Sequence, residues 1–201
     1  MKTHIYDKSN IAEVAMIIKR GGMIAIPTDT IYGLAINSQS LTAIEALKDA
    51  KGRPEDKPFP MMVCSLSQLQ EVAMLSKREK MVIKRFMPGA LTVIFKKRRS
   101  VAKEVTNGLA TIGVRMPDDP WVLKLIALVG APLLVPSANL SGESACLNHS
   151  EVLEQLNGRI DGVVKGVSGD QQASTIVDMS EEKIKILRPG KISLAQIEEL
   201  I

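Results

Sequence analysis

This chain has few of the cysteine and histidine residues that form disulfides or bind zinc. Of the 201 residues, only two are cysteine and two are histidine. Cys64 and Cys146 lie far apart and match neither a zinc-ligand spacing nor a redox spacing. His4 and His149 are equally separated, so we predict no structural metal. Both cysteines are expected to be free thiols in a reducing cytoplasm.

Aromatic residues are also scarce, and no apolar run approaches the length of a membrane span. Aromatics make up 3% of the chain against a hydrophobic share of 45%, which predicts an aliphatic, methionine-rich core. The longest apolar run, Leu123–Leu134, is interrupted by Lys124, Gly130 and Pro132. The N-terminal residues Met1–His4 lack the apolar core of a signal peptide. We therefore expect a soluble cytoplasmic protein with no membrane partner.

Positive charge is concentrated in one part of the chain. The net charge is only +4, but residues 77–103 include ten basic side chains and a single acid, Glu79. The basic residues are Lys77, Arg78, Lys80, Lys84, Arg85, Lys96, Lys97, Arg98, Arg99 and Lys103. This cluster either attracts nucleic acid by neutralising phosphates or forms a solvated helix face and strand end.

Helical and strand patterns alternate irregularly along the chain. Helices are predicted at 11–20, 40–51, 67–75, 77–86, 121–129, 150–156 and 193–200, and strands at 23–26, 61–64, 91–95, 111–115, 133–135, 162–165, 175–178 and 184–187. No repeat, low-complexity segment or long linker divides them. We predict one α+β domain over residues 1–201, with a mixed, twisted sheet rather than a doubly wound fold.

A predicted helix end concentrates cations at Lys51-Gly52-Arg53-Pro54. Gly52 can adopt the positive φ of a helix end, and Pro54 prevents continuation. Lys51 and Arg53 flank this turn, and Lys57 follows. A guanidinium beside an ammonium suits a ligand with several anionic oxygens, above all a polyphosphate. The alternative is that both cations simply complement the dipole of the helix.

The common nucleotide-binding signatures are absent. The sequence contains no Gly-x-x-x-x-Gly-Lys-Ser/Thr loop and no Gly-x-Gly-x-x-Gly. With two histidines and no Gly-x-Ser-x-Gly elbow, a Ser-His-Asp arrangement is also disfavoured. A nucleotide would therefore have to be bound by scattered side chains.

Three predicted strand ends offer such side chains. Residues 27–34 follow one strand and carry two hydroxyls, a carboxylate and a phenol; residues 136–142 follow another and place a hydroxyl and an amide two residues apart; a third strand has two polar residues on one face. These residues are Thr28, Asp29, Thr30 and Tyr32, then Ser137, Asn139 and Ser141, then Thr111 and Arg115. For each segment alone, the alternative is a capped turn.

Six motifs occur in order along most of the chain. They are Pro-Thr-Asp-Thr-Ile-Tyr-Gly-Leu, Lys-x-Arg-Pro, Met-Pro-Gly-Ala-Leu-Thr, Gly-Val-Arg-Met-Pro, Pro-Ser-Ala-Asn-x-Ser-Gly and Leu-Arg-Pro-Gly. Together they resemble the YrdC-like family, the threonylcarbamoyl-adenylate synthases, from about residue 8 to residue 190. The resemblance implies an α/β domain with a large twisted sheet around an open, basic cavity.

The resemblance also implies a reaction. Family members condense L-threonine, bicarbonate and ATP to threonylcarbamoyl-adenylate and pyrophosphate, the first step of forming threonylcarbamoyladenosine (t6A, position 37) in tRNA. By position, Thr30 and Arg115 resemble the threonine-binding residues. The residues that resemble the ATP-binding set are Lys51, Arg53, Thr111, Ser137, Asn139 and Arg188.

Within that reaction, Lys51 and Arg53 are the expected catalytic cations. They would stabilise the charge that develops as a carbamate oxygen attacks the α-phosphorus, with Mg²⁺ on the departing pyrophosphate. We expect no metal ligand from the protein itself. Further pocket candidates are Thr28, Asp29, Tyr32, Lys57 and Ser141, and we assign Asp29 and Tyr32 no chemical step.

The chain departs from the family pattern at three points. Ala145 stands where many members place a hydroxyl toward the nucleotide, and Met62 stands where some place a histidine near threonine. Longer members add a second C-terminal domain. This chain is similar to the short bacterial form, in which other proteins of the pathway complete the tRNA modification.

Two alternatives to the synthase stay open. The first is a protein associated with double-stranded RNA, tRNA or the ribosome that binds RNA without adenylation activity. The second is a relative that carbamoylates another acceptor, since YrdC-like domains also occur within larger carbamoyl-transferring proteins. The absence of a fused domain and of a zinc-type cysteine cluster in this sequence counts against the second.

Overall fold

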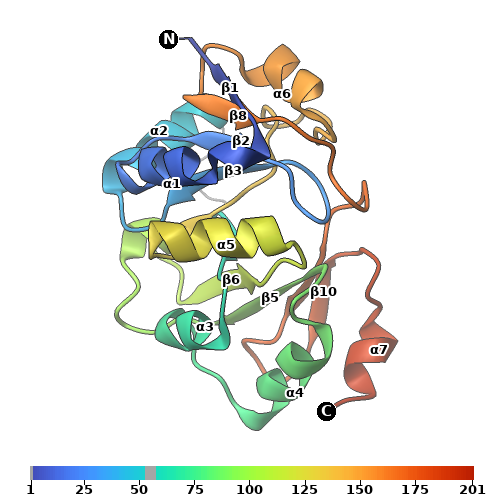
Figure 1. Ribbon diagram of the computed structural model, residues 1–201. Helices are drawn as coiled ribbons and strands as arrows, with labels where there is room; N and C mark the ends of the chain where they lie inside the picture. The colour runs from blue at the N-terminus through green and yellow to red at the C-terminus, as the bar shows by residue number, and fades with distance from the viewer. Residues whose placement is uncertain (1, 53–57) are drawn as a thin grey trace.

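Ten short strands form one mixed sheet in the computed structural model, which describes residues 2–52 and 58–201 (Figure 1). Their order is β1-β8-β2-β3-β7-β4-β6-β5-β9-β10. The strands are β1 (His4–Tyr6), β2 (Ile24–Ile26), β3 (Gly33–Asn37), β4 (Met61–Met62), β5 (Leu91–Lys96), β6 (Thr111–Arg115), β7 (Leu133–Leu134), β8 (Gly162–Val164), β9 (Thr175–Asp178) and β10 (Lys185–Arg188). The sheet contains both parallel pairs, such as β4–β6 and β5–β9, and antiparallel pairs, such as β5–β6. The predicted mixed sheet is confirmed.

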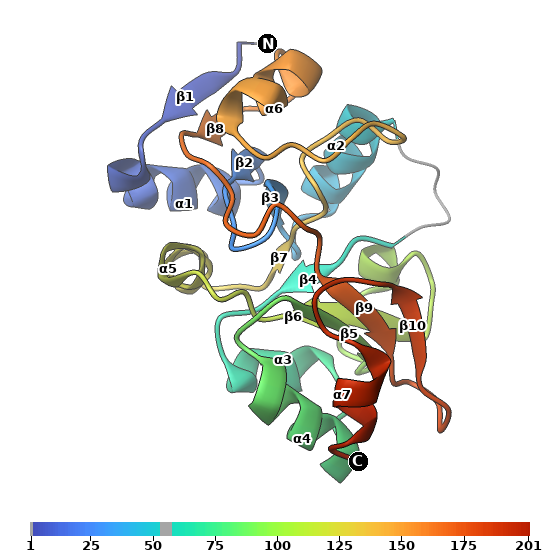
Figure 2. The ribbon, with the colours of Figure 1, turned by 90° about the vertical axis from the view of Figure 1, so that its right-hand side faces the viewer.

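Helices cover the sheet on both faces. They are α1 (Ile11–Lys19), α2 (Leu41–Lys51), α3 (Leu66–Val72), α4 (Lys77–Phe86), α5 (Pro120–Val129), α6 (His149–Leu156) and α7 (Leu194–Glu198), with short 3₁₀ turns at Lys8–Asn10 and Lys103–Thr106. Figure 2 shows α1 and α5 together on one face of the sheet, while α3, α4 and α7 gather near β5 and β10. This arrangement leaves the middle of the sheet between two groups of helices.

The buried residues form two hydrophobic clusters. Val14 and Ile18 of α1 pack with Val122 and Ile126 of α5 in the smaller cluster. The larger cluster lies on the other face and includes Leu47 of α2. Both clusters consist largely of aliphatic side chains and methionine, as composition predicts. Two packed faces hold the central strands in place beneath the site.

Local sequence signals determine several helix ends. Ser40 caps α2, because its hydroxyl accepts a hydrogen bond from the Ala43 amide at 3.3 Å. Gly52 ends α2 with φ of 56°, the left-handed conformation that glycine adopts without strain. Asp119 caps α5 through the amides of Trp121 and Val122, with proline as the first helical residue. The predicted end of α2 at Gly52 is confirmed.

Two strands lie where none was predicted. β1 is short and partly exposed at the edge of the sheet, so its pattern is weak. β3 begins in the segment 27–34, which was predicted to follow a strand, and continues to Asn37; its first residue, Gly33, has no Cβ, and a Cβ there would lie 2.4 Å from Val135. Helix α3 ends earlier than predicted, because Ala73 forms a bridge with Lys97 instead of continuing the helix.

Candidate functional site

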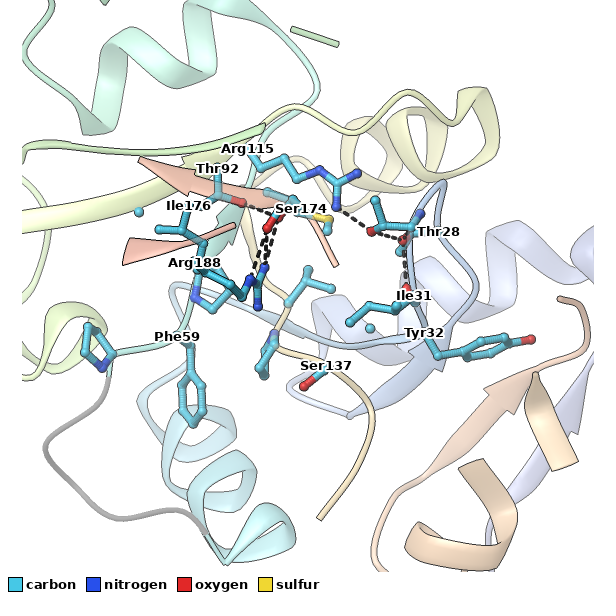
Figure 3. Close-up of a pocket in the computed structure, with 18 of the residues that line it drawn as sticks. Thr28, Ile31, Tyr32, Phe59, Thr92, Arg115, Ser137, Ser174, Ile176 and Arg188 are labelled. Carbon is cyan, nitrogen blue, oxygen red and sulfur yellow. Dashed lines mark hydrogen bonds between the residues drawn. The ribbon is translucent and has the colours of Figure 1, made fainter. Parts of the chain in front are cut away.

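A cavity of about 200 Å³ lies over the middle of the sheet, where segments far apart in sequence meet (Figure 3). It is bounded by the connection after β2, the segment leading into β4, the turn after β7, and strands β5, β6, β9 and β10. Its polar lining residues are Thr28, Thr30, Thr92, Arg115, Ser137, Ser174 and Arg188. Strand geometry explains part of this set, since Gly113 and Arg115 are two residues apart and face one side. The fold thus brings four hydroxyl-bearing segments and two guanidinium groups together.

Arg115 is held rigidly at one end of the cavity. Its Nη1 donates to the Thr30 hydroxyl at 2.7 Å, its Nη2 to Asp29 Oδ2 at 2.6 Å, and its Nε to the Gly89 carbonyl at 2.9 Å. Burial lowers the pKa of Arg115, while the Asp29 carboxylate opposes that effect. These contacts use three of the five guanidinium N–H groups, so two stay available for an anion. The arrangement is a preorganised carboxylate-binding group.

A second backbone segment supports the threonines beside Arg115. The amides of Gly169, Asp170 and Gln171 donate to the carbonyls of Thr28, Asp29 and Thr30 at 3.0, 2.9 and 3.0 Å. Gly169 is required by close approach, because a Cβ there would lie 2.6 Å from the Asp29 carbonyl oxygen. The 168–171 segment therefore determines where the Thr28–Thr30 loop lies.

Arg188 supplies the other cation of the cavity. Its Nε and Nη2 donate to the Ser174 carbonyl at 3.0 and 2.9 Å, and the Ser174 hydroxyl lies 2.8 Å from that of Thr92. Burial lowers the pKa of Arg188, and the positive charge of Arg115 lowers it further. Two guanidinium groups that repel each other in one cavity favour a ligand that carries more than one negative group.

Lys51 is placed differently from what the sequence led us to expect. Its side chain is 2% exposed. Its ammonium donates to the carbonyls of Ser137 and Asn139, the latter at 2.7 Å, and it is not among the described residues that line the cavity. The main chain contributes too, since the Ser141 amide donates to the Lys51 carbonyl at 2.9 Å. In this structure Lys51 contacts the wall of the cavity from behind.

The other predicted site residues divide between the cavity and its supports. Tyr32 lines the cavity, but its hydroxyl points away and donates to the Val164 carbonyl at 2.9 Å (Figure 3). Asp29 pairs with Arg115 behind the cavity. Asn139 donates from Nδ2 to two carbonyls of its own loop. Thr111 lies on the same strand face as Arg115 but further along the strand. Among the described lining residues, neither Thr111, Asn139 nor Ser141 occurs.

Two predicted site residues, Arg53 and Lys57, lie outside the described residues. The two positions that depart from the family pattern are both described. Met62 lines the cavity and pairs with Arg115 in the register of β4 and β6. Ala145 is half-buried and is not part of the described cavity lining.

Sequence reasoning missed two hydroxyls of the site, those of Thr92 and Ser174. Thr92 ends the Met-Pro-Gly-Ala-Leu-Thr motif, and Ser174 directly precedes a predicted strand. They meet because β5 and β9 are paired in parallel, with Thr92 opposite Ile176. Polar residues at the start of two apolar strands were the available signal, but only the pairing shows that they adjoin.

The basic segment 77–103 is partly committed to internal contacts. Both terminal nitrogens of Arg78 donate to backbone carbonyls of residues 179–182, Lys97 donates to the Val101 carbonyl at 2.7 Å, and Arg98 donates to the Gln70 carbonyl at 2.5 Å. Arg99 and Lys103 are exposed. The segment therefore offers a smaller free basic surface than its composition indicates.

Within residues 2–52 and 58–201, no three acidic, histidine or cysteine side chains are grouped so that they could hold a metal ion. No helix of the same ranges is sufficiently long and apolar to cross a bilayer.

Comparison with known proteins gives consistent similarities. Residues 16–190 match the Sua5/YciO/YrdC family, which is described as "Telomere recombination". The chain is 39% identical over 194 residues to the threonylcarbamoyl-AMP synthase of Bacillus subtilis, covering 95% of this chain and 56% of that protein. It is 32% identical over 186 residues to the threonylcarbamoyl-AMP synthase of Vibrio vulnificus, covering 90% of this chain and 99% of that protein.

A solved structure shows the same fold. The structure of Pyrococcus abyssi Sua5 complexed with L-threonine superimposes with a TM-score of 0.94 at 35% identity, covering 99% of this chain and 61% of that one. The chain thus spans little more than half the length of its Bacillus and Pyrococcus relatives.

Proposed function

This chain belongs to the Sua5/YciO/YrdC family, and from that premise we propose that it makes L-threonylcarbamoyl-adenylate from L-threonine, bicarbonate and ATP, with release of pyrophosphate. The observation that carries the proposal is the cavity itself, in which Arg115 and Arg188 face one space lined by hydroxyl groups. The reaction joins two anions, a carbamate and a nucleotide triphosphate. Two fixed cations in a partly desolvated cavity offset the repulsion between them. We further propose that residues 1–201 act as one domain in this reaction.

The threonine carboxylate is proposed to bind at Arg115. Asp29, Thr30 and Gly89 already orient the guanidinium, so binding requires little reorganisation. A planar fork with two free N–H groups matches a carboxylate in a bidentate geometry. The Pyrococcus structure in complex with L-threonine supports a threonine site in this fold.

ATP is proposed to bind toward Arg188, with its phosphates between this residue and the Ser137 turn. Arg188 is oriented by Ser174, and Ser137 and Thr92 also line the cavity. Thr111 and Asn139 are proposed to contact the nucleotide beyond the described cavity. Mg²⁺ is proposed to enter as part of the nucleotide substrate.

The chemistry needs no covalent enzyme intermediate. The threonine amine attacks bicarbonate to form a carbamate and water. A carbamate oxygen then forms a bond to the α-phosphorus while the bond to the pyrophosphate oxygen breaks. The protein contributes by positioning both reactants and by stabilising the negative charge that spreads over the phosphoryl oxygens. Arg188 is the described cation best placed for the phosphates, and Arg53 stays a prediction.

A direct assay tests the proposed function. The protein is incubated with bicarbonate and α-³²P-labelled ATP, with and without threonine, and the products are separated by chromatography. We expect a labelled adenylate and pyrophosphate that both require threonine. Arg115→Ala should abolish the product, while Lys124→Ala on the exposed side of α5 serves as the control. Pyrophosphate release that does not depend on threonine would contradict the proposal.

RNA binding is the second candidate, and the exposed side chains of Arg99 and Lys103 favour it. It could accompany the first, because the proposed product serves tRNA modification together with other proteins of that pathway. Replacing both residues by glutamine should weaken RNA binding and flatten its salt dependence. If the protein without substitutions binds RNA but forms no adenylate, RNA binding is favoured over adenylate synthesis as its function. The same assay also tests whether the protein carbamoylates an acceptor other than threonine. Other amines are supplied in place of threonine, and the labelled adenylate is measured for each.

A further inference from the structure

We propose that Lys51 is a positioning residue that holds the cavity wall at Ser137, and that it does not itself contact the reacting phosphates. This inference rests on the proposed function only where it is tested by enzyme activity; its structural test needs no substrate. It differs from the role that the sequence pattern assigns to Lys51, and it follows from where the ammonium lies.

The first observation is the pair of carbonyls that the ammonium binds. Lys51 Nζ donates to the carbonyl oxygens of Ser137 and Asn139, two residues apart in the turn after β7. Carbonyls two residues apart on an extended or turning chain point to a similar side, so one compact tetrahedral donor group can bind both. An ammonium used in this way fixes the orientation of both peptide groups. Ala138 and Asn139 lie between those two peptide groups, and both are buried.

The second observation is that this turn is fixed from the opposite side as well. The Ala138 amide donates to the Tyr32 carbonyl at 2.8 Å, and Gly33 forms an isolated bridge with Ser137. The main-chain carbonyl of Lys51 accepts from the Ser141 amide at 2.9 Å. The turn is thus held between the end of α2 and the start of β3. Lys51 supplies both the side-chain and the main-chain contacts on the α2 side.

The third observation is that the held turn forms part of the cavity. Pro136 and Ser137 line it, and Figure 3 shows Ser137 beside the space between Arg188 and the Thr28–Tyr32 segment. Among the described residues, none makes a hydrogen bond to the Ser137 hydroxyl. A hydroxyl with no hydrogen-bond partner among the described residues takes its position from its backbone, and Lys51 is one of the contacts that hold that backbone. Loss of the ammonium should displace this hydroxyl.

Burial explains why the residue is a lysine that stays in place. A buried ammonium is strongly disfavoured without hydrogen-bond partners, and carbonyl oxygens supply the compensation. Turning the same ammonium toward a ligand would leave both carbonyls without this donor. The structure therefore favours Lys51 keeping its contacts when the cavity is filled.

Hydrogen exchange tests the structural half of the proposal in the ligand-free protein. In Lys51→Met the amides of Ala138, Asn139 and Ser141 should exchange at least about 10-fold faster, because the turn opens more often. Lys48→Met is the matched control, since Lys48 lies one turn earlier on α2 and pairs with Glu45 at 3.0 Å. It removes the same charge and should leave these amides unchanged. Unchanged exchange in Lys51→Met would overturn the proposal.

A double-mutant cycle tests the functional half. Lys51→Met should lower kcat/KM by about 100-fold, the loss that follows when a binding group is displaced by about 1 Å. If Lys51 acts through Ser137, adding Ser137→Ala to Lys51→Met should cost no more than a further factor of about 2. Adding Arg188→Ala instead should multiply the two losses. Multiplicative losses for Lys51 and Ser137 would mean that each contacts the ligand independently, and would overturn the proposal.

A conservative variant covers the case in which Lys51→Met fails to fold. Lys51→Gln keeps an N–H donor for the carbonyls but has no charge. Lys51→Gln should retain at least about a tenth of the activity of the protein without substitutions if Lys51 acts by binding the turn. It should retain none if the positive charge of Lys51 acts on the phosphates. The two proposals fail separately. An unchanged protein without threonine-dependent adenylate formation contradicts the proposed function, while the exchange experiment still decides the role of Lys51.

Discussion

At the scale of single residues, the site depends on side chains whose partners are nearly all supplied by the protein. Arg115 has Asp29, Thr30 and Gly89, and Arg188 has Ser174. Such contacts keep the two cations apart and correctly directed before any ligand binds. The same contacts make these residues important for stability as well as for binding.

Replacing Arg115 tests that double role. Arg115→Met leaves the Asp29 carboxylate, whose side chain is 14% exposed, without its cation. Breaking a buried pair on one side destabilises a protein by about 3–5 kcal/mol. We expect the free energy of unfolding in urea to fall by that amount. The fall should be smaller for Arg188→Met, because that change leaves no carboxylate without its cation. Equal stabilities for the two variants would contradict this account of Arg115.

The buried thiol of Cys146 gives a pH prediction. Burial raises the pKa of Cys146 from 9.0 to about 11, with the nearby Glu151 adding to the effect. The folded state therefore favours the neutral thiol, so its stabilisation is complete below pH 9 and is lost as the pH rises through about 11. Unfolding free energy measured from pH 8 to 11 should fall less steeply in Cys146→Ala than in the unchanged protein.

Tyr6, Tyr32 and Cys64 contribute to the background slope of that experiment, since burial raises the pKa of each. Hydrogen bonds at the Cys64 thiol oppose the rise in its pKa. Cys64→Ala is the matched control. A pH dependence that is identical in Cys146→Ala and the unchanged protein would show that this thiol is accessible to solvent.

At the scale of elements, the connections carry more of the site than the strands do. The Thr28–Thr30 loop is held by the 168–171 segment, and the Ser137 turn is held by the end of α2. Each connection is supported by a segment more than 80 residues away in sequence. The geometry of the cavity therefore depends on tertiary contacts between loops.

Gly169→Ala tests the support of the threonine loop. The new Cβ would approach the Asp29 carbonyl oxygen to 2.6 Å, and backbone atoms cannot move aside without shifting the loop. We expect a destabilisation of about 1–3 kcal/mol in urea unfolding and weaker threonine binding by calorimetry. Gly113→Ala, whose Cβ would make ordinary contacts from 3.6 Å, is the control for stability. A fully stable Gly169→Ala would mean that the 168–171 segment is free to move.

The cap of α5 allows a prediction that is independent of function. Asp119 Oδ1 accepts from the Trp121 amide at 2.8 Å and from the Val122 amide at 3.2 Å. Asp119→Ala should cost about 1 kcal/mol of unfolding free energy. The neighbouring Asp118→Ala removes the same charge without the cap, and we expect a change within about 0.5 kcal/mol. Tryptophan fluorescence follows both transitions, because Trp121 lies in the first turn of this helix.

At the scale of the whole molecule, the cavity is built from nearly the full length of the chain. Its lining extends from Thr28 to Arg188, and the sheet order places β4 and β6 between segments from both ends of the sequence. A ligand that fills this cavity therefore contacts several separate parts of the fold at once. Such a ligand should stabilise the molecule as a unit.

Thermal unfolding tests that expectation. A ligand that binds only the folded state at 100 times its Kd adds about 2.7 kcal/mol of stability. Threonine and a non-hydrolysable ATP analogue together should raise the Tm by more than the sum of their separate effects, because each covers part of the same cavity. A strictly additive shift would indicate two independent sites, and Arg115→Ala should remove the threonine contribution.

Local chemistry made much of the fold predictable. Ser40, Gly52 and Asp119 act on hydrogen bonds within a few residues, so their roles can be identified from neighbouring sequence. The short β1 escaped prediction because it pairs with the distant β8, and β3 was missed although it pairs with the neighbouring β2 as well as the distant β7. In the site, the strand alternation of β6 predicted that Arg115 and Thr111 share a face, but not that only Arg115 reaches the cavity.

The sequence by itself determined the element types, the ends of several helices and the ordered motifs that mark the family, because these depend on residues close together in the chain. Only the tertiary structure decided what each polar side chain contacts. Lys51 binds carbonyls 86 and 88 residues away, and Arg115 binds a hydroxyl 85 residues away. The energy of a buried ammonium depends on which acceptors surround it, and those acceptors come together only when the chain folds.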